Sequence, residues 1–178
     1  LGDDRLVVQF LEAEGYGAFM TDDFETARSR LEEALAMAER ADDKMATGTG
    51  HHTVAQVARL QGRLDDAADH YRSAIRIAGE LGATLAVIEP LQGLAAVLIA
   101  TGGPERGVRL LGAQAAIREQ AGGGPPPEWL RLGDPFSEAK VQLGEERYEA
   151  AWEAGRKLSV DQAVADALGE PSAVPASQ

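Results

Sequence analysis

The amino-acid sequence predicts an all-α fold, built from helix–turn–helix units in tandem and closed by a smaller helical block. Two observations carry this prediction. A pattern of turn, acidic helix start, small residue and large apolar residue recurs every forty residues. Only 5% of the residues are aromatic and alanine is abundant instead, which is typical of helices that pack closely. No strand pattern of alternating apolar and polar residues competes with this interpretation.

The repeated pattern marks the start of the second helix of each unit. The runs that align are Phe24-Glu25-Thr26-Ala27, Leu64-Asp65-Asp66-Ala67 and Pro104-Glu105-Arg106-Gly107. Four residues after each small residue comes a large apolar one, at Leu31, Tyr71 and Leu111. Residues spaced by four lie on one face of a helix, so the small residue admits a neighbouring helix and the large one fills the space beside it.

An apolar segment precedes each of these helices and predicts the first helix of the unit. The three segments are roughly Leu6–Phe19, Val54–Leu60 and Leu85–Ala100. Gly62 and Gly102 follow the later two and are expected to end them, because glycine tolerates the left-handed conformation at a helix C-terminus. The extra residues near 42–50 and 79–84 are expected to lengthen helices or loops.

Two prolines affect the predicted helices of the third unit. Pro104 suits the first turn of a helix, where its missing N–H costs nothing. Pro90 falls inside the segment Leu85–Ala100 and predicts either a kink or the end of a short preceding helix.

The runs 22–27 and 62–67 resemble the turn and second helix of tetratricopeptide repeats, although a period of forty exceeds the usual 34. This resemblance implies a right-handed superhelix of helix–turn–helix repeats. The predicted organisation has three repeats within 1–121, a Gly/Pro linker, a C-terminal helical cap and a tail or linker. The boundaries are about 5–41, 45–81 and 85–121 for the repeats, 122–127 for the linker, 128–170 for the cap and 171–178 for the tail.

Three short helical patterns make up the predicted cap. The first, Glu128–Leu143, is interrupted by Gly133-Asp134-Pro135, and the second is Glu145–Gly155. The third starts at Ser159, with Gln162 three residues later as a capping box. We expect the last two to dock on the third repeat, with Trp152 and Val164 facing inward, since a terminal repeat otherwise leaves an apolar face in water.

A second resemblance covers roughly residues 85–170. The runs Arg109-Leu110-Leu111-Gly112-Ala113 and 143–164, which include Trp152-Glu153-Ala154-Gly155-Arg156, are similar to the C-terminal part of bacterial signalling ATPases and LuxR-type, MalT-like transcriptional regulators. The resemblance implies a fragment of a multidomain cytoplasmic regulator, as does the start Leu1-Gly2-Asp3, which is not an initiation sequence. This chain contains no glycine-rich phosphate loop ending in Lys-Ser/Thr.

Charge and composition exclude several classes of function. A net charge of −12 disfavours direct contact with nucleic acid and with an anionic membrane surface. The absence of cysteine excludes disulfides and cysteine-ligated zinc. The longest apolar run, Leu94–Ala100, is too short to span a bilayer.

Catalytic and metal sites find no support in the remaining side chains. His51 and His52 point about 100° apart on a helix and cannot easily share a metal ion, even with His70 opposite them. Paired acids such as Asp65-Asp66 lie at helix starts, where negative charge favours the exposed N–H groups. Trp129 and Trp152 are interpreted as packing anchors. We therefore predict no enzyme activity, no cofactor and no metal.

The predicted binding surface is the concave face formed by the first helix of each repeat. Alignment of the repeats places eleven side chains there: Gln9, Glu12, Tyr16, Phe19, Thr49, His52, Gln56, Arg59, Glu89, Gln92 and Ile99. Their mixture of aromatic, amide and cationic groups suits an extended peptide or a small polar inducer. The predicted function is a protein- or ligand-binding regulatory domain. The alternative is a self-association scaffold, such as a homodimer, whose exposed solenoid ends pair between chains; ordinary surface residues remain the simplest interpretation of the eleven.

Overall fold

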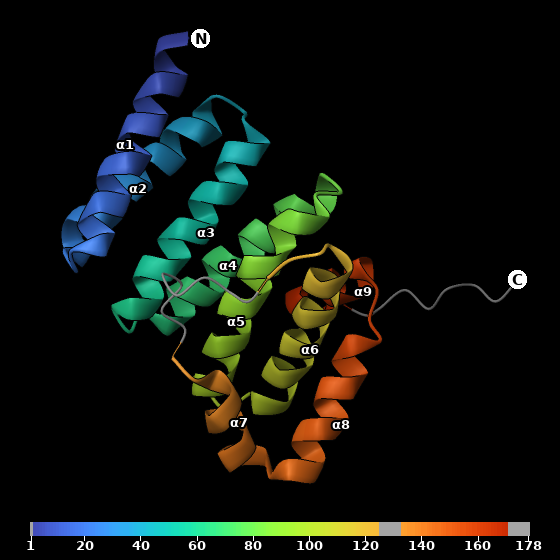
Figure 1. The fold of residues 1–178 in the computed structure, drawn as a ribbon. Coiled ribbons are helices and arrows are strands. Elements are labelled where there is room, and N and C mark those ends of the chain that lie inside the picture. The colour runs from blue at the N-terminus through green and yellow to red at the C-terminus, as the bar shows by residue number, and fades with distance from the viewer. Residues whose placement is uncertain (1, 125–132, 171–178) are drawn as a thin grey trace, which may run out of the picture. The chain divides into compact units, whose positions relative to one another are not determined.

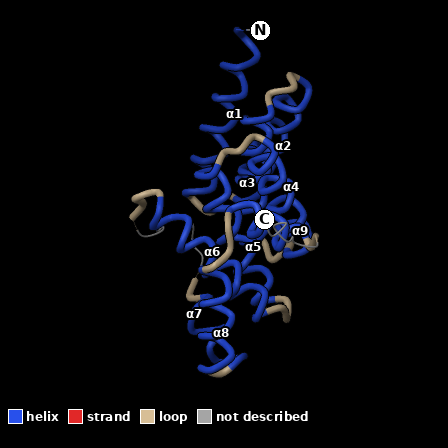
Figure 2. Tube along the Cα trace, turned by 90° about the vertical axis from the view of Figure 1, so that its right-hand side faces the viewer, coloured by secondary structure: helices blue, strands red, loops and turns tan. Residues whose placement is uncertain are grey.

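The computed structural model describes residues 2–124 and 133–170, and every regular element in these ranges is a helix (Figures 1 and 2). The all-α prediction is confirmed. The chain forms two compact units, residues 1–77 and 78–178. The prolines 125–127, Trp129 and the tail 171–178, all assigned roles from the sequence, lie outside the described residues.

Turns recur every twenty residues and give the forty-residue repeat its structural basis. In each turn the third residue donates its N–H to the carbonyl five residues earlier, from Asp23 to Ala18 at 2.9 Å and from Arg63 to Ala58 at 2.9 Å. Such a bond is typical of a helix C-terminus at which one residue adopts the left-handed conformation. The residues with positive φ at these turns are Asp22, Asp42, Gly62, Gly82, Gly102 and Gly122.

The first unit contains α1 (Gly2–Met20), α2 (Phe24–Arg40), α3 (Lys44–Leu60) and α4 (Leu64–Glu80) up to Ile77. Aspartates start two of these helices: the side chain of Asp23 accepts from Thr26 N at 3.1 Å, and that of Asp43 from Ala46 N at 3.0 Å. Each bond satisfies an N–H that the helix leaves unpaired.

Small residues bring the helices of the first unit together, as the repeat pattern predicts. Ala27 is fully buried, and a Cβ at Gly15 on α1 would collide with Leu31 of α2. The core here is a cluster of buried apolar side chains joined by Phe24 and Leu60: Phe19, Ala27, Leu31, Leu35, Val54 and Val57. Tyr71 is 1% exposed, so its predicted position in the core is confirmed.

The start of α3 differs from the prediction. The apolar pattern predicted a helix over Val54–Leu60, but α3 begins ten residues earlier, at Lys44. Gly48 and Gly50 weaken the helical pattern before Val54, because glycine in a helix interior is unfavourable. In the structure these glycines face Ile77 and Leu35, whose atoms lie 3.2 and 3.0 Å from where a Cβ would stand. The extra residues of the long repeat therefore lengthen a helix.

The second unit starts with the last turn of α4, followed by a 3₁₀ helix (Thr84–Val87), α5 (Ile88–Ala100) and α6 (Pro104–Gln120). Pro90 lies in the first turn of α5, where a missing N–H is tolerated. The proline therefore separates two helices, which is one of the two predicted outcomes. The block predicted to be a cap contains α7 (Pro135–Leu143), α8 (Glu145–Arg156) and α9 (Val160–Leu168).

Within this unit α8 packs directly against α6 (Figure 1). Two glycines make the contact possible: a Cβ at Gly155 would overlap the carbonyl oxygen of Arg109, and one at Gly112 would overlap that of Trp152. The backbones of the two helices thus touch without intervening side chains. Arg156 adds a two-pronged ion pair to Glu119, at 3.0 and 2.8 Å.

Helix α9 is fastened to α6 by charged hydrogen bonds. The Arg109 guanidinium donates from Nε and Nη2 to the two carboxylate oxygens of Asp166, both at 2.7 Å. Arg106 donates to the backbone carbonyl of Asp166. The capping box of Ser159 and Gln162 is formed as predicted. Bidentate pairs of this kind fix orientation as well as adding energy.

The two side chains predicted to face inward are both half-buried. Val164 lies over Gly79 in the last turn of α4. Trp152 instead joins an aromatic group with Tyr148 and Phe136, with ring centres 6.4 and 5.9 Å away. Its backbone meets α6, while Ala151 and Gly155 supply the buried face of α8.

Candidate functional site

A groove in the first unit is the strongest candidate for a binding site. It has a volume of about 500 Å³ and runs between α1 and α3 beside the end of α2. We call it the α1–α3 groove. Its lining residues come from α1, from the end of α2, from the α2–α3 turn and from α3: Arg5, Val8, Gln9, Glu12, Met37, Ala38, Ala41, Asp43, Met45, Ala46 and Thr49.

The base of the groove is apolar and rests on packed side chains. Val8 and Ala38 are buried, and Val8 belongs to a small core cluster against which Met37 packs. Met45, by contrast, is 54% exposed. Methionine is flexible and polarisable, so it adapts to ligands of irregular shape.

Two carboxylates stand on the walls of the groove. Burial raises the pKa of Glu12, and the negative charge of Asp43 raises that pKa further. Asp43 also caps α3 through Ala46 N, so its position is set by the helix start. The charge of Asp43 thus disfavours the charged form of Glu12.

Three of the predicted concave-face residues line this groove: Gln9, Glu12 and Thr49. Gln9 and Thr49 are exposed, and Glu12 is half-buried. The remaining two from α1 lie elsewhere. Tyr16 is half-buried and Phe19 is 2% exposed in the core, edge-on to Phe24 at 6.3 Å.

The other predicted residues of α3 are mostly enclosed. His52 and Gln56 are buried, and the His52 ring lies 6.1 Å from that of Tyr71. Burial lowers the pKa of His52 to about 4. Arg59 is half-buried, and its charge favours the ionised form of Tyr71, although burial raises the pKa of that phenol.

The predicted residues of the third repeat lie in the second unit. Gln92 is buried and accepts from Arg118 Nη2 at 3.4 Å. Burial raises the pKa of Glu89, while the charge of Arg118 opposes the rise. Ile99 is fully buried, against the position where a Cβ at Gly107 would stand.

Comparison with known proteins bears out the repeat interpretation. A family model described as tetratricopeptide repeat matches residues 12–80. Residues 12–80 form tetratricopeptide repeats. Repeats of this type imply a protein-interaction domain and are generally non-catalytic. The matched segment includes Glu12 and Thr49 of the α1–α3 groove.

The chain is also similar to larger proteins of mycobacteria. It is 30% identical over 144 residues to proteins named "Putative HTH-type transcriptional regulator" from Mycobacterium bovis (strain AF2122/97) and Mycobacterium tuberculosis (strains CDC 1551 and H37Rv). The alignment covers 75% of this chain but 16% of each relative, so the chain spans about one sixth of their length. No solved structure gives a significant match.

In the second tetratricopeptide repeat His70 lies opposite His51, as the sequence predicted. Nδ1 of His51 lies 2.9 Å from Nδ1 of His70, and Nε2 of His51 lies 3.8 Å from Glu39. Burial lowers the pKa of both imidazoles. Across residues 2–124 and 133–170, no cluster of three or more metal-binding side chains is found. The pair is explained by one ring donating to the other, which requires at least one neutral histidine.

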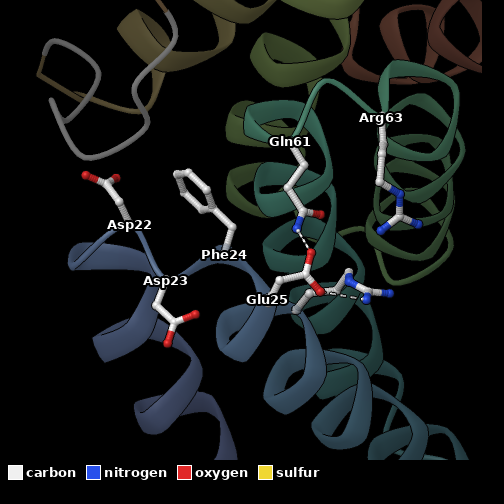
Figure 3. A pocket seen from close by; sticks show the side chains of 7 residues that line it. Asp22, Asp23, Phe24, Glu25, Gln61 and Arg63 are labelled. Atoms are coloured by element: carbon white, nitrogen blue, oxygen red, sulfur yellow. Dashed lines mark hydrogen bonds and ion pairs between the residues drawn. The ribbon is translucent and has the colours of Figure 1, made fainter.

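A second, more open hollow of about 640 Å³ lies at the turns of the two repeats (Figure 3). Two of its bonds meet at one carboxylate: Gln61 donates to Glu25 at 3.0 Å (Figure 3), and Arg28 donates to it at 3.1 Å. The bond from Gln61 joins the residue after α3 to α2, whereas the bond from Arg28 lies within α2.

Sequence reasoning missed the groove residues that lie outside the first helices. Met37 comes from the end of α2 and Asp43 from a turn, while Arg5 and Met45 lie at helix starts. A repeat alignment identifies the faces of the first helices, but it does not show that the α2 end forms one side of the groove. The spacing of Arg5, Gln9 and Glu12 was the available signal, since these residues share a face of α1.

Residues 2–124 and 133–170 contain no helix with the length and apolarity needed to cross a lipid bilayer.

Proposed function

We propose that this chain is the partner-binding regulatory region of a bacterial transcriptional regulator, and that the α1–α3 groove receives a segment of a protein partner. The groove itself carries the proposal. It is concave, has an apolar base and displays the polar side chains of Gln9 and Thr49 at its exposed edges. Such a combination suits a peptide, whose side chains fill the base while its backbone finds hydrogen-bond partners.

Similarity to proteins named as HTH-type transcriptional regulators supports the regulatory part of the proposal. In a protein of that kind, binding at the repeats would bias an output domain through a difference in affinity between two states. We also propose a LuxR-type relationship and a cytoplasmic location, which the resemblance of residues 85–170 implies.

A peptide library displayed on phage tests the groove. We expect peptides that are enriched on the wild-type chain to bind Thr49→Trp at least tenfold more weakly, because the indole would fill the groove. Thr49 is exposed, so the fold accommodates the larger side chain. Ala13→Trp, at an exposed α1 position outside the groove, is the matched control and retains binding. Equal binding to all three proteins would move the site elsewhere.

Self-association is the second candidate, and a specific surface favours it. Leu6 and Phe10, one helical turn apart on α1, are 65% and 63% exposed, and Val7 beside them is 43% exposed. Exposed apolar side chains in a group mark contact surfaces. Sedimentation velocity at micromolar concentration tests this candidate: a dimer that Phe10→Lys converts to a monomer supports it, and a monomeric wild type refutes it.

A further inference from the structure

Glu12 and Asp43 are the two acids that line the groove. The pKa of Glu12 is raised, first by burial and then by Asp43. Among the described residues, neither carboxylate takes part in an ion pair with Lys, Arg or His. A cation bound between them would offset the charge of Asp43 and favour the charged form of Glu12.

Arg5 is the basic side chain that lines the groove. It precedes Glu12 by seven residues, which places it about 10 Å away along the axis of α1. Two acids and one base therefore line the groove, which gives its lining a net negative charge on a chain whose net charge is −12.

The groove base fits the rest of a basic side chain. Lysine and arginine lay their methylene stems on apolar surface while the charged head stays at a polar edge. Val8, Met37 and Met45 offer such a surface beside the two acids. Gln9 and Thr49 add amide and hydroxyl groups at the exposed edge, which suits a peptide backbone better than an isolated cation.

We propose that the α1–α3 groove selects a basic segment of a protein partner, with a lysine or arginine head between Glu12 and Asp43 and its stem on the methionines. This inference rests on the proposed function and adds the chemistry of the partner. It also predicts that association weakens as salt screens the charges.

Three displayed peptide libraries of equal length test the proposal. Every third position is fixed as Lys in the first library, Gln in the second and Glu in the third, and all other positions are random. We expect at least tenfold greater enrichment of the Lys library on the wild-type chain. The double variant Glu12→Gln, Asp43→Asn should remove this advantage and leave enrichment of the Gln library unchanged. Asparagine is a good N-cap, so α3 keeps its start.

A matched control removes two charges elsewhere. Asp65→Asn with Glu146→Gln changes two exposed acids outside the groove and should keep the preference for Lys. If it loses the preference as fully as the groove variant does, or if the groove variant keeps it, the attraction belongs to the whole acidic chain and the proposal fails.

The remaining outcomes separate this inference from the function on which it rests. Peptides from the Gln or Glu library that bind as strongly as the Lys peptides, and that Thr49→Trp excludes, would overturn basic selectivity while leaving the groove as the binding site. If Thr49→Trp has no effect on any library, both proposals fail.

Discussion

Single residues at the turns decide where each helix ends. Gly62 has φ of 76° and lies in open space, so its requirement is conformational only. Asp22 and Asp42 adopt the same left-handed region in the first two turns. Aspartate tolerates this region better than most residues. The sequence predicted glycine at the helix ends, and the structure extends that rule to the two aspartates.

Gly62→Ala should lower the free energy of unfolding by about 1–2 kcal/mol, because a Cβ is unfavourable at positive φ. Gly17→Ala is the matched control. Gly17 lies inside α1 with no atom near its missing Cβ, so alanine there should raise stability by about 0.5–1 kcal/mol. Urea unfolding monitored by circular dichroism measures both changes. Opposite signs are required; two losses of equal size would mean that Gly62 has no special backbone role.

Tyr71 occupies the position of the large apolar residue in the second repeat, and the structure buries it. Tyr71→Ala should cost about 3–5 kcal/mol, since truncating a buried aromatic side chain removes contacts and leaves a cavity. Tyr71→Phe, which keeps the ring, should cost about 1 kcal/mol. A melting temperature for Tyr71→Ala within one degree of wild type would contradict the register of the repeats.

Pairs of helices are set by how closely their backbones approach. The α6–α8 contact depends on Gly112 and Gly155, where added Cβ atoms would overlap carbonyl oxygens of the facing helix. The run around Trp152 is distinctive in the sequence. The residue of that run that makes the contact is Gly155 and not the tryptophan side chain.

Gly155→Ala should destabilise the second unit by at least about 1–3 kcal/mol, because α6 and α8 must separate to admit the methyl group. Both tryptophans of the chain belong to residues 78–178, so their fluorescence reports on this unit. Ala154→Ser, at an exposed neighbouring position, should change stability by less than about 0.5 kcal/mol. Equal melting curves for the two variants would mean that α8 does not pack as described.

At the scale of the whole molecule, the histidines make stability depend on pH. The pKa of His52 falls from 6.5 in its ordinary state to about 4 in the folded chain, so the unfolded chain binds more protons between these values. Stability is therefore present above pH 6.5 and is lost on acidification toward pH 4. His51 and His70 have lowered pKa values and act in the same direction.

Between pH 7.5 and 5.0, His52 alone should remove about 2 kcal/mol of unfolding free energy. Urea unfolding at the two pH values measures this, and His52→Gln should reduce the loss. The raised pKa values of Glu12 and Glu89 act in the opposite direction, because these carboxyls take up protons in the folded chain already above pH 4.5, so the comparison with His52→Gln isolates the histidine contribution. A stability that is equal at both pH values would contradict the burial of His52.

The predicted cap should affect the solubility of the whole chain. Removing residues 143–178 deletes α8 and α9 and uncovers the face of α6 around Gly112 and Arg109. An uncovered terminal repeat presents apolar surface to water. We expect the shortened chain to aggregate or dimerise in size-exclusion chromatography. A monomer as stable as the intact chain would show that the cap is dispensable.

The sequence by itself determined the repeat period, the helix–turn–helix units and the buried positions Ala27, Leu31 and Tyr71. These features depend on interactions a few residues apart, which spacing reveals. The repeat alignment also predicted the helix faces that carry Gln9, Glu12 and Thr49, because residues forty apart occupy equivalent faces. These three residues line the α1–α3 groove. Only the tertiary structure decided that Phe19 and Ile99 are core residues, since burial depends on which helices pack around a face. It alone placed Met37 and Asp43 in the groove, because those contacts join segments whose separation in the sequence carries no local pattern.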